Sequence, residues 1–337
     1  MIEAPYKVSI GIPVYNASKY IERCARSIFS QDYDDLEIIF VDDASSDNSV
    51  KIIRETLKDY PNREGQVHII QHERNKGVSE ARNTLLAAFT GLFISFVDSD
   101  DYLLPCAIKR LVQEQTTKDY DLVSGQILED FGEEEHLITD SSPKSADGML
   151  FLVTKDTITH YNVARIYRLS IINQHSIHYE EDIKYGEDWI FLVEFLLKAT
   201  SVSWVNDTIY VYDRTNEQSA MHNILKKENF CKFVLADMIV FSRMKQLVDA
   251  KEQKYSDVIE CQMAKRLEDG LIEAYYTNNN KMFAELKQYI GKLRKCNISK
   301  NYHYRKASLG SYVSPLTYKL YFLIRKLFSN PLKRLMR

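Results

Sequence analysis

The chain has 337 residues, of which 45% are hydrophobic and 27% charged, a composition that is ordinary for a globular protein and excludes a fully disordered or collagen-like chain. Its five cysteines are scattered, odd in number and never spaced as a CxxC pair, which argues against a disulfide framework or a zinc site and favours a reducing, cytoplasmic location. No run of about eighteen apolar residues could span a membrane, and the first residues lack the pattern of a signal peptide.

The net charge of −3 conceals an uneven distribution along the chain. No acidic residue follows Glu285, whereas 13 Lys and Arg residues lie between Lys287 and Arg337. The body of the chain is therefore acidic and only its C-terminal part is basic, which argues against a nucleic-acid partner. A basic tail of this kind predicts contact with something anionic.

Strand-like and helix-like segments alternate over the first hundred residues. Short apolar runs predict strands, and apolar residues at helical spacing predict helices. The expected strands are Val8–Val14, Leu36–Val41, Val67–Ile70 and Phe93–Val97, and the expected helices are Tyr20–Gln31, Asn48–Tyr60 and Ser79–Phe89. This alternation predicts parallel strands joined by right-handed crossovers, with helices on both faces of the sheet.

Beyond the first hundred residues the pattern is mixed. Strands are expected at Asp121–Leu128 and Ser201–Tyr212, and the acidic segment Glu129–Asp140 is expected to be a mobile loop. Apolar residues return to helical spacing from about Ile224 to Lys295. The pattern predicts two halves of one α/β domain and a helical C-terminal region, at residues 1–110, 111–223 and 224–337.

Polar clusters follow each of the first four expected strands. In parallel sheets with crossover helices, ligands bind beyond the C-terminal ends of the strands. The clusters are Tyr15-Asn16, Asp42-Asp43, Asn75-Lys76-Gly77 and Asp98-Ser99-Asp100-Asp101. Four such coincidences predict a binding site at that edge of the sheet.

The fourth cluster carries three carboxylates. Residues two apart on a strand point the same way, so Asp98 and Asp100 are expected to project together, with Asp101 beside them. Carboxylates this close repel one another unless a cation lies among them, and Mg²⁺ or Mn²⁺ prefers oxygen ligands and also binds phosphates. The alternative is an acidic turn that only ends the strand.

The second cluster and a nearby arginine each have two interpretations. One aspartate of the pair Asp42-Asp43 can cap the following helix, while the other accepts a hydrogen bond from a nucleobase that Tyr15 borders. Arg82 is either an exposed helix residue or, close to Gly77, a contact to a phosphate.

Seven segments together resemble glycosyltransferase family 2, a family of inverting enzymes with the GT-A fold. The first four segments are IPVYN (12–16), FVDDASSDNS (40–49), NKGVSEARN (75–83) and FVDSDDYLLP (96–105). The other three are ARIYRLSII (164–172), YGEDWIF (185–191) and VYDRTNEQSAMH (211–222). Each segment alone is weakly specific, but the set has the order and spacing of the family.

The resemblance implies a role for each matching residue. Asp43 would contact the nucleobase and Asp98 would lie near the ribose. The donor, expected to be a UDP-sugar, would be bound by Pro13, Tyr15, Asp43, Gly77, Arg82, Asp98 and Ser99. A Mn²⁺ or Mg²⁺ ion, offsetting charge on the leaving diphosphate, would be held by Asp100, Asp101 and His222. Asp188 would be the general base that takes the proton from the acceptor hydroxyl.

Two of these roles have structural alternatives. Asp188 can instead cap a helix expected at Trp189–Lys198, and a lone histidine such as His222 is often structural. Two positions also depart from the family pattern, because Leu85 stands where Gly is common and Arg165 where Lys is frequent. These departures bear on packing and on acceptor or diphosphate contacts.

The C-terminal segment Tyr318–Arg337 mixes apolar and basic residues without one acid. A helix with its apolar residues on one face can lie in the headgroup region of an anionic bilayer. Such a contact would suit a lipid-linked acceptor and a peripheral position on the inner face of the cell membrane. The alternative is a terminal helix that packs on the core.

The sequence as a whole predicts an α/β, GT-A-like domain with a mostly parallel sheet and a helical C-terminal extension. The predicted activity is transfer of a sugar, with inversion, to a glycan or lipid-linked acceptor in polysaccharide biosynthesis. A nucleotidyltransferase would show a Gly-rich, basic loop after the first strand, which IPVYNASKY lacks. The other alternative is a non-catalytic carbohydrate- or membrane-binding protein on the same fold, against which the complete set of carboxylates argues.

Overall fold

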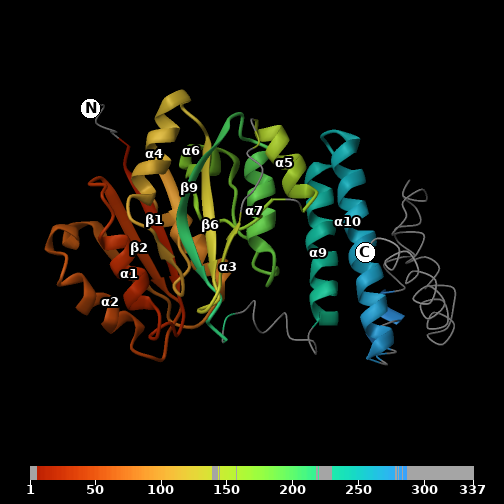
Figure 1. Cartoon of the computed structure of the whole chain (residues 1–337), viewed down its shortest axis with the longest axis horizontal. Coiled ribbons are helices and arrows are strands. Elements are labelled where there is room, and N and C mark those ends of the chain that lie inside the picture. The colour runs from red at the N-terminus through yellow and green to blue at the C-terminus, as the bar shows by residue number, and fades with distance from the viewer. Residues whose placement is uncertain are drawn as a thin grey trace, which may run out of the picture. The chain divides into compact units, whose positions relative to one another are not determined.

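The computed structural model describes residues 6–138, 143, 145–156, 158–217, 219, 230–277, 279, 281–282 and 284–286. Its contacts divide the chain into two compact units, Met1–Ser219 and Ala220–Arg337 (Figure 1). The boundaries expected at residues 110 and 223 stay predictions. His222 and the basic segment Tyr318–Arg337 lie outside the described residues.

One sheet organises the first unit. Its strands are β1 (Val8–Val14), β2 (Leu36–Asp42), β3 (Val67–Gln71), β4 (Phe93–Phe96), β5 (Tyr102–Leu103), β6 (Leu122–Asp130), β7 (Glu135–Ile138), β8 (Arg165–Arg168) and β9 (Val202–Asp213). Its helices are α1 (Ile21–Phe29), α2 (Ser49–Leu57), η1 (Pro61–Gln66), α3 (Val78–Ala88), α4 (Ala107–Lys118), α5 (Ala146–Thr154), α6 (Leu169–His175) and α7 (Glu187–Leu196). The order of strands is β3-β2-β1-β4-β8-β6-β9-β5, with β7 paired to β6.

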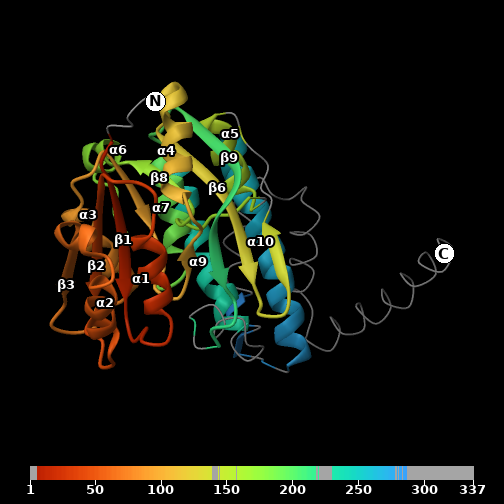
Figure 2. The same cartoon turned by 60° about the vertical axis from the view of Figure 1, so that its left-hand side comes forward.

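The first four strands run parallel, as their alternation with helices predicts. β1 pairs with β2 and β4, and β2 with β3, so these four strands lie side by side (Figure 2). The later strands make the sheet mixed, because β8 pairs antiparallel with both β4 and β6, whereas β6 and β9 are parallel. The α/β class and its flanking helices are confirmed, and the second half of the sheet adds the antiparallel pairings.

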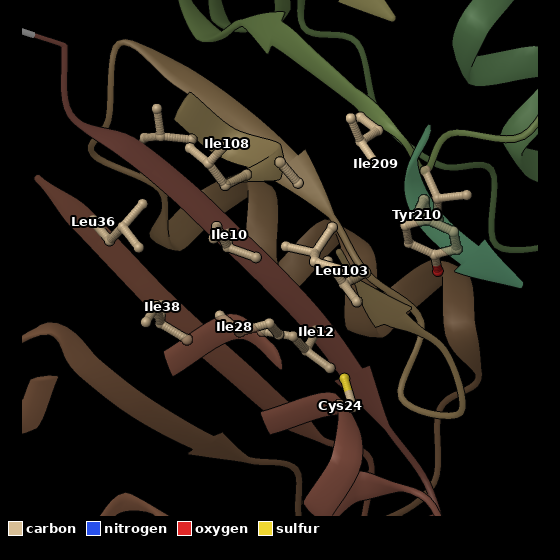
Figure 3. Packing of buried hydrophobic residues seen from close by; sticks show 14 of the residues in the cluster. Ile10, Ile12, Cys24, Ile28, Leu36, Ile38, Leu103, Ile108, Ile209 and Tyr210 are labelled. Carbon is tan, nitrogen blue, oxygen red and sulfur yellow. The ribbon is translucent and has the colours of Figure 1, made fainter. Parts of the chain in front are cut away.

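A continuous hydrophobic core covers one face of the sheet. Side chains alternate between the faces of a strand, so Val8, Ile10 and Ile12 of β1 share this face. Ile10 and Ile12 lie beside Ile28 and Cys24 of α1, and α4 contributes further buried residues (Figure 3). The helical spacing in the sequence therefore identifies the side of α1 that packs on the sheet.

The opposite face carries α3 and α7. The backbone of Gly11 in β1 allows Phe89, just after α3, to approach so closely that an added Cβ would lie 2.4 Å from its ring. Phe96 of β4 makes an edge-to-face contact with Phe191 of α7, their centroids 6.0 Å apart. Phe191 also stacks on Tyr179, at 4.5 Å. These aromatic contacts hold α7 against the strand that leads into the carboxylate cluster.

The acidic segment 129–140 is a β-hairpin in its described part, so the prediction of a mobile loop is wrong there. β6 extends to Asp130 and pairs with β7, so that Glu129 lies opposite His136 and Asp130 opposite Glu135. The same end of β6 also pairs with β9, where Asp130 lies opposite Asp213. Ladder hydrogen bonds on both sides stabilise an extended segment whose composition alone favours a loop.

The second unit contains a helical hairpin. α9 (Phe230–Val248) and α10 (Gln253–Tyr276) are joined by a short connection, and they pack closely at Gly270, where an added Cβ would lie 2.8 Å from Val234. An ion pair of 2.8 Å between Arg266 and the buried Asp237 also joins them. These helices agree with the pattern expected from about Ile224. Among the described helices of the chain, none has the length and apolar character that crossing a membrane requires.

Candidate active site

The ends of the parallel strands meet at one edge of the sheet, as predicted. Asn16, which follows β1 with a left-handed φ of 49°, accepts the backbone N–H of Ser46 at 2.8 Å. Its own backbone N–H donates to the Ser45 hydroxyl at 2.9 Å. The loops after β1 and β2 are thus joined directly. Pro13 is buried at the end of β1, whereas Tyr15 beyond it is 53% exposed and available to border a ligand.

Asp43 joins the loops after β2 and β3. Its carboxylate accepts backbone N–H groups of Lys76 at 2.9 Å and of Gly77 at 2.8 Å, and lies 2.7 Å from Nδ1 of His72. Gly77 has a φ of 93°, which a residue with a side chain rarely adopts, and it immediately precedes α3. Asp43 therefore sits at the predicted edge, but it is buried and it shapes the turn that begins α3.

Neither Asp42 nor Asp43 caps α2, so that alternative is wrong. Asp47 accepts the backbone N–H of Ser49, the first residue of α2, at 2.9 Å. Asp42 instead accepts the backbone N–H of Ser45 and the side-chain amide of Gln71, each at 3.2 Å.

The carboxylate cluster Asp98–Asp101 forms a turn. β4 ends at Phe96, so the alternation of a strand does not extend to Asp98 and Asp100, and that part of the prediction is wrong. The backbone N–H of Asp101 donates to the Asp98 carbonyl at 3.1 Å and closes the turn. Ser99 and its neighbours Asp98 and Asp100 are half-buried.

Asp101 is the buried member of the cluster. Its carboxylate accepts the Tyr210 hydroxyl at 2.6 Å and the backbone N–H of Asp213 at 2.9 Å. Burial, followed by the charges of Asp100 and Asp98, raises the pKa of Asp101 well above its ordinary value. Asp101 therefore joins the turn to the end of β9.

Asp100 is held from two sides. Its Oδ2 accepts the side-chain amide of Asn216 at 2.8 Å, and its carbonyl accepts the Arg23 guanidinium at 2.8 Å. Arg23 also pairs with Asp213 and lies over the Tyr102 ring. Burial and the nearby charge of Asp98 raise the pKa of Asp100. Such a half-buried, electron-rich oxygen suits a hard cation.

Arg82 is buried, so the alternative of an exposed helix residue is wrong. Only 5% of its surface is exposed, and its guanidinium contacts Glu187 through Nη1 at 2.5 Å and Asp98 through Nη2 at 3.0 Å. The same group lies 5.4 Å from the centre of the Tyr179 ring. Desolvation lowers the pKa of Arg82, but the neighbouring carboxylates outweigh it and raise the pKa overall.

Asp188 lies in the first turn of α7, and Gly186 precedes that helix with a φ of 76°. One oxygen accepts the backbone N–H of Trp189 at 2.8 Å, but α7 already begins at Glu187 with Gly186 as its N-cap, so Asp188 is not the capping residue that the alternative predicts. Burial raises the pKa of Asp188 to about 6, against the opposing effects of Arg82 and the Trp189 N–H. Since the side chain is still half-buried and not enclosed, the helix contact does not exclude a role as a base.

The structure thus gathers most of the predicted residues at one edge of the sheet. Hydrogen bonds and ion pairs connect Asp98 to Arg82 and Glu187, and Glu187 precedes Asp188. Among the described residues no group of three His, Cys, Asp or Glu side chains is arranged to hold a metal ion. Any ion there would need oxygens from a ligand as well as from the protein.

Sequence reasoning missed several residues that support these carboxylates. Glu187 and Asn216 lie within the matched segments 185–191 and 211–222, which was the available signal. Arg23, His72 and Tyr210 carry no local signal, because their partners are far away in the chain.

The fold and the carboxylate-rich edge define an α/β protein with a candidate ligand site beyond the ends of its parallel strands, where such sheets bind ligands. Residues 9–176 match the family model described as Glycosyl transferase family 2. The chain belongs to this family, which confirms the resemblance seen in its motifs.

Curated relatives agree with this membership. The uncharacterized glycosyltransferase EpsJ of Bacillus subtilis is 30% identical over 224 residues, covering 63% of this chain and 62% of that protein. The poly(ribitol-phosphate) beta-glucosyltransferase of Bacillus spizizenii is 30% identical over 253 residues, covering 74% of this chain and 38% of that protein. The chain spans less than two thirds of the length of either relative.

Solved structures share the fold and confirm the GT-A prediction. Residues 1–349 of Staphylococcus aureus TarS in complex with UDP-GlcNAc superpose with a TM-score of 0.66 at 21% identity, covering 84% of this chain and 80% of that one. The mannosyltransferase PcManGT of Pyrobaculum calidifontis in complex with GDP-Man and Mn²⁺ gives a TM-score of 0.56 at 14% identity, covering 92% and 87%.

Proposed function

We propose that this chain is an inverting glycosyltransferase that moves a sugar from a nucleotide-diphosphate donor to a glycan or lipid-linked acceptor. One observation carries the proposal: Asp188, with a pKa of about 6, is linked through Glu187 and Arg82 to the Asp98–Asp101 turn. A basic carboxylate beside an oxygen-rich turn supplies the two functions that inverting transfer requires. Membership in glycosyltransferase family 2 supports the same reaction.

Asp188 is proposed as the general base. With a pKa of about 6 it is ionised at neutral pH, yet it is basic enough to accept a proton from an acceptor hydroxyl as that oxygen attacks the anomeric carbon. The new bond forms on the face of the sugar opposite the leaving diphosphate, so that the configuration inverts. The Trp189 N–H holds one oxygen of the carboxylate and fixes its orientation.

Asp100 is proposed to hold Mn²⁺ or Mg²⁺. The half-buried carboxylate of Asp100, whose pKa is raised by burial and by the charge of Asp98, is a hard, electron-rich donor of the kind that these ions prefer. Asp101 and His222 complete the predicted ligands; the bonds of Asp101 to Tyr210 and Asp213 suit a residue that shapes the turn. When bound, the ion offsets negative charge on the leaving diphosphate.

The donor is proposed to lie along the ends of β1, β2 and β4. Tyr15 would border the base with Pro13 as the pocket wall, and Asp98 and Ser99 would lie near the ribose. Asp43 and Gly77 would shape the base side of this pocket, since the Asp43 oxygens are occupied by His72 and by the backbone that begins α3. A UDP-sugar is the proposed donor, and the UDP-GlcNAc bound by TarS, a protein of the same fold, supports that choice.

The acceptor and location are proposed from the relatives and the sequence. A curated relative is a poly(ribitol-phosphate) beta-glucosyltransferase, which supports a polymer acceptor in surface-polysaccharide biosynthesis. A cytoplasmic enzyme working on a lipid-linked acceptor would use the basic segment Tyr318–Arg337 to reach an anionic membrane surface.

The test measures release of nucleoside diphosphate from a panel of nucleotide-sugars, with and without Mn²⁺, for wild type and Asp100→Ala. Membrane extract serves as the source of acceptor. Metal-dependent release from one donor, lost in the variant, is the expected result. No release from any donor would contradict the proposal and leave a non-catalytic carbohydrate- or membrane-binding protein as the better account.

A further inference from the structure

Arg82 connects three parts of the first unit. It stands on α3, which follows the turn held by Asp43, and its two terminal nitrogens bond Asp98 after β4 and Glu187 at the start of α7. The side chain is 6% exposed and the Glu187 side chain 11%. A cation buried this deeply holds its partners in fixed positions, because separating them would leave a charge unpaired in a poorly solvated place.

These contacts bear on the expected phosphate contact of Arg82. A guanidinium recognises phosphate through two parallel N–H bonds, but Nη1 and Nη2 each donate to a carboxylate here. Nε is buried and has no hydrogen-bond partner among the described residues. A diphosphate would therefore have to reach a side chain that is only 6% exposed and whose guanidinium fork is already engaged by Asp98 and Glu187.

We propose that Arg82 is a positioning residue, which places Asp188 against the donor side of the site by holding Glu187 and Asp98, and is not a phosphate ligand. The inference rests on the proposed function, since it assigns Asp188 the role of base. Glu187 precedes Asp188 in the first turn of α7. Holding the Glu187 carboxylate in place therefore also fixes the orientation of the start of that helix relative to the sheet.

The charges facing Asp188 make the proposal measurable. Arg82 approaches from α3, Asp98 from the turn after β4 and Glu187 from the same helix, while the phenols of Tyr161, Tyr167 and Tyr179 also interact with Asp188. The positive charge of Arg82 lowers the pKa of Asp188. The charge of Asp188 raises the pKa of Glu187, and the charge of Asp98 raises the pKa of Asp188, because neighbouring carboxylates disfavour each other's ionised form.

Three substitutions separate charge from geometry. Arg82→Met removes the cation, so the pKa of the base rises and the acidic limb of the kcat/KM profile moves up by about one pH unit. Glu187→Gln removes an anion and still accepts a hydrogen bond, so the limb moves down. Arg82→Lys keeps the charge but lacks the guanidinium fork that reaches both carboxylates, so kcat falls by about tenfold, while the limb stays within about half a unit.

The control is Arg168→Lys. Arg168 also bonds two carboxylates, those of Asp119 and Asp121, but lies at the opposite edge of the sheet, where it pairs with Phe93 at the start of β4. This variant is expected to leave kcat, the pH profile and donor binding unchanged. Circular dichroism of each variant confirms folding, and because Glu187→Gln and Arg82→Lys retain polar partners, they test the proposal even if Arg82→Met does not fold.

Binding of nucleoside diphosphate, measured by calorimetry with Mn²⁺, decides between the two roles of Arg82. Opposite pH shifts in Arg82→Met and Glu187→Gln, with the dissociation constant changed less than about threefold, support positioning. A dissociation constant that rises more than about tenfold in Arg82→Lys, with an unmoved limb, would overturn it in favour of a phosphate contact. An acidic limb of the kcat/KM profile that does not shift in either Arg82→Met or Glu187→Gln, when both are active, would also overturn the positioning role. An inactive wild-type enzyme would instead refute the proposed function itself.

Discussion

The side-chain amide of Asn216 donates to Oδ2 of Asp100 at 2.8 Å, across 116 residues of sequence. Asn216 follows the end of β9, and Asp213, the last residue of that strand, accepts the Arg23 guanidinium that also bonds the Asp100 carbonyl. The orientation of the Asp100 carboxylate is therefore set by the second half of the sheet, although Asp100 itself follows the first half.

The first prediction concerns this bond. Asn216→Ala removes a hydrogen bond that orients the proposed metal ligand, so Mn²⁺ affinity should fall by about tenfold, in line with other residues that support ligands. Paramagnetic resonance of free Mn²⁺ in the presence of nucleoside diphosphate measures this directly. Asn173→Ala, at an exposed position of α6, is the matched control. Equal affinities in the two variants would contradict the role given to Asn216.

Replacing the proposed base should suppress turnover without weakening donor binding. Asp188→Asn keeps the shape of the side chain but cannot accept a proton, so kcat should fall by about 10²- to 10⁴-fold. Calorimetry with nucleoside diphosphate should give an unchanged dissociation constant. Asp182→Asn, an exposed carboxylate close in sequence, serves as control. A variant that retains a tenth or more of the wild-type kcat would rule Asp188 out as the base.

The pH dependence of wild type follows from the same residue. The base acts only when ionised, and its pKa is raised to about 6, so kcat/KM should fall tenfold per unit as the pH drops below about 6. Initial rates between pH 5 and pH 8 at saturating metal measure this limb. A rate that stays constant down to pH 5, as an aspartate with an ordinary pKa of about 4 would give, would show that Asp188 does not control the rate.

The carboxylate of Glu37 should contribute to the stability of the fold and not to activity. It is 6% exposed and accepts bonds from Lys7, Ser9 and Thr90 at the edge of the sheet away from the site. Glu37→Gln should lower the free energy of unfolding by about 2 kcal/mol at pH 7, because a buried charged network loses its acceptor. Urea unfolding measures the change, with the exposed Glu55→Gln as control.

The sign of the pH effect at Glu37 is set by its depressed pKa. Although burial raises the pKa, the bonds from Ser9, Thr90 and Lys7 lower it to about 2 from 4.5. The stabilisation is complete above pH 4.5 and is lost as the pH falls toward 2. The difference between wild type and Glu37→Gln should therefore shrink over that range, and a constant difference would contradict the assignment.

Gly91 should not tolerate a side chain. An added Cβ would lie 2.7 Å from the Lys7 carbonyl oxygen and 2.8 Å from the Ser9 nitrogen, both backbone atoms that cannot move aside cheaply. Gly91→Ala should lower the free energy of unfolding by about 1–3 kcal/mol. Gly65→Ala, which meets nothing within 4 Å, should be neutral or slightly stabilising. Similar urea midpoints for the two variants would refute the packing argument.

The elements of the first hundred residues follow from local pattern. β2 is expected at Leu36–Val41 and found at Leu36–Asp42, and α3 is expected at Ser79–Phe89 and found at Val78–Ala88. Such agreement is possible because strands buried on both faces are short apolar runs, and amphipathic helices repeat their apolar residues every turn. The hairpin of β6 and β7 cannot be predicted in this way. Its acidic composition is typical of a loop, and the strands are stabilised by the pairing of β6 with β7 and with β9.

The sequence by itself determined the family, the parallel first half of the sheet and the edge where the polar clusters gather. These depend on the period of apolar residues and on motif spacing, both of which are local. Only the tertiary structure decided that Arg82 pairs with Glu187, 105 residues away, and that Asn216 holds Asp100. Contacts between distant segments depend on how the sheet brings its two halves together, and no local pattern in a single chain records which buried charge will meet which partner.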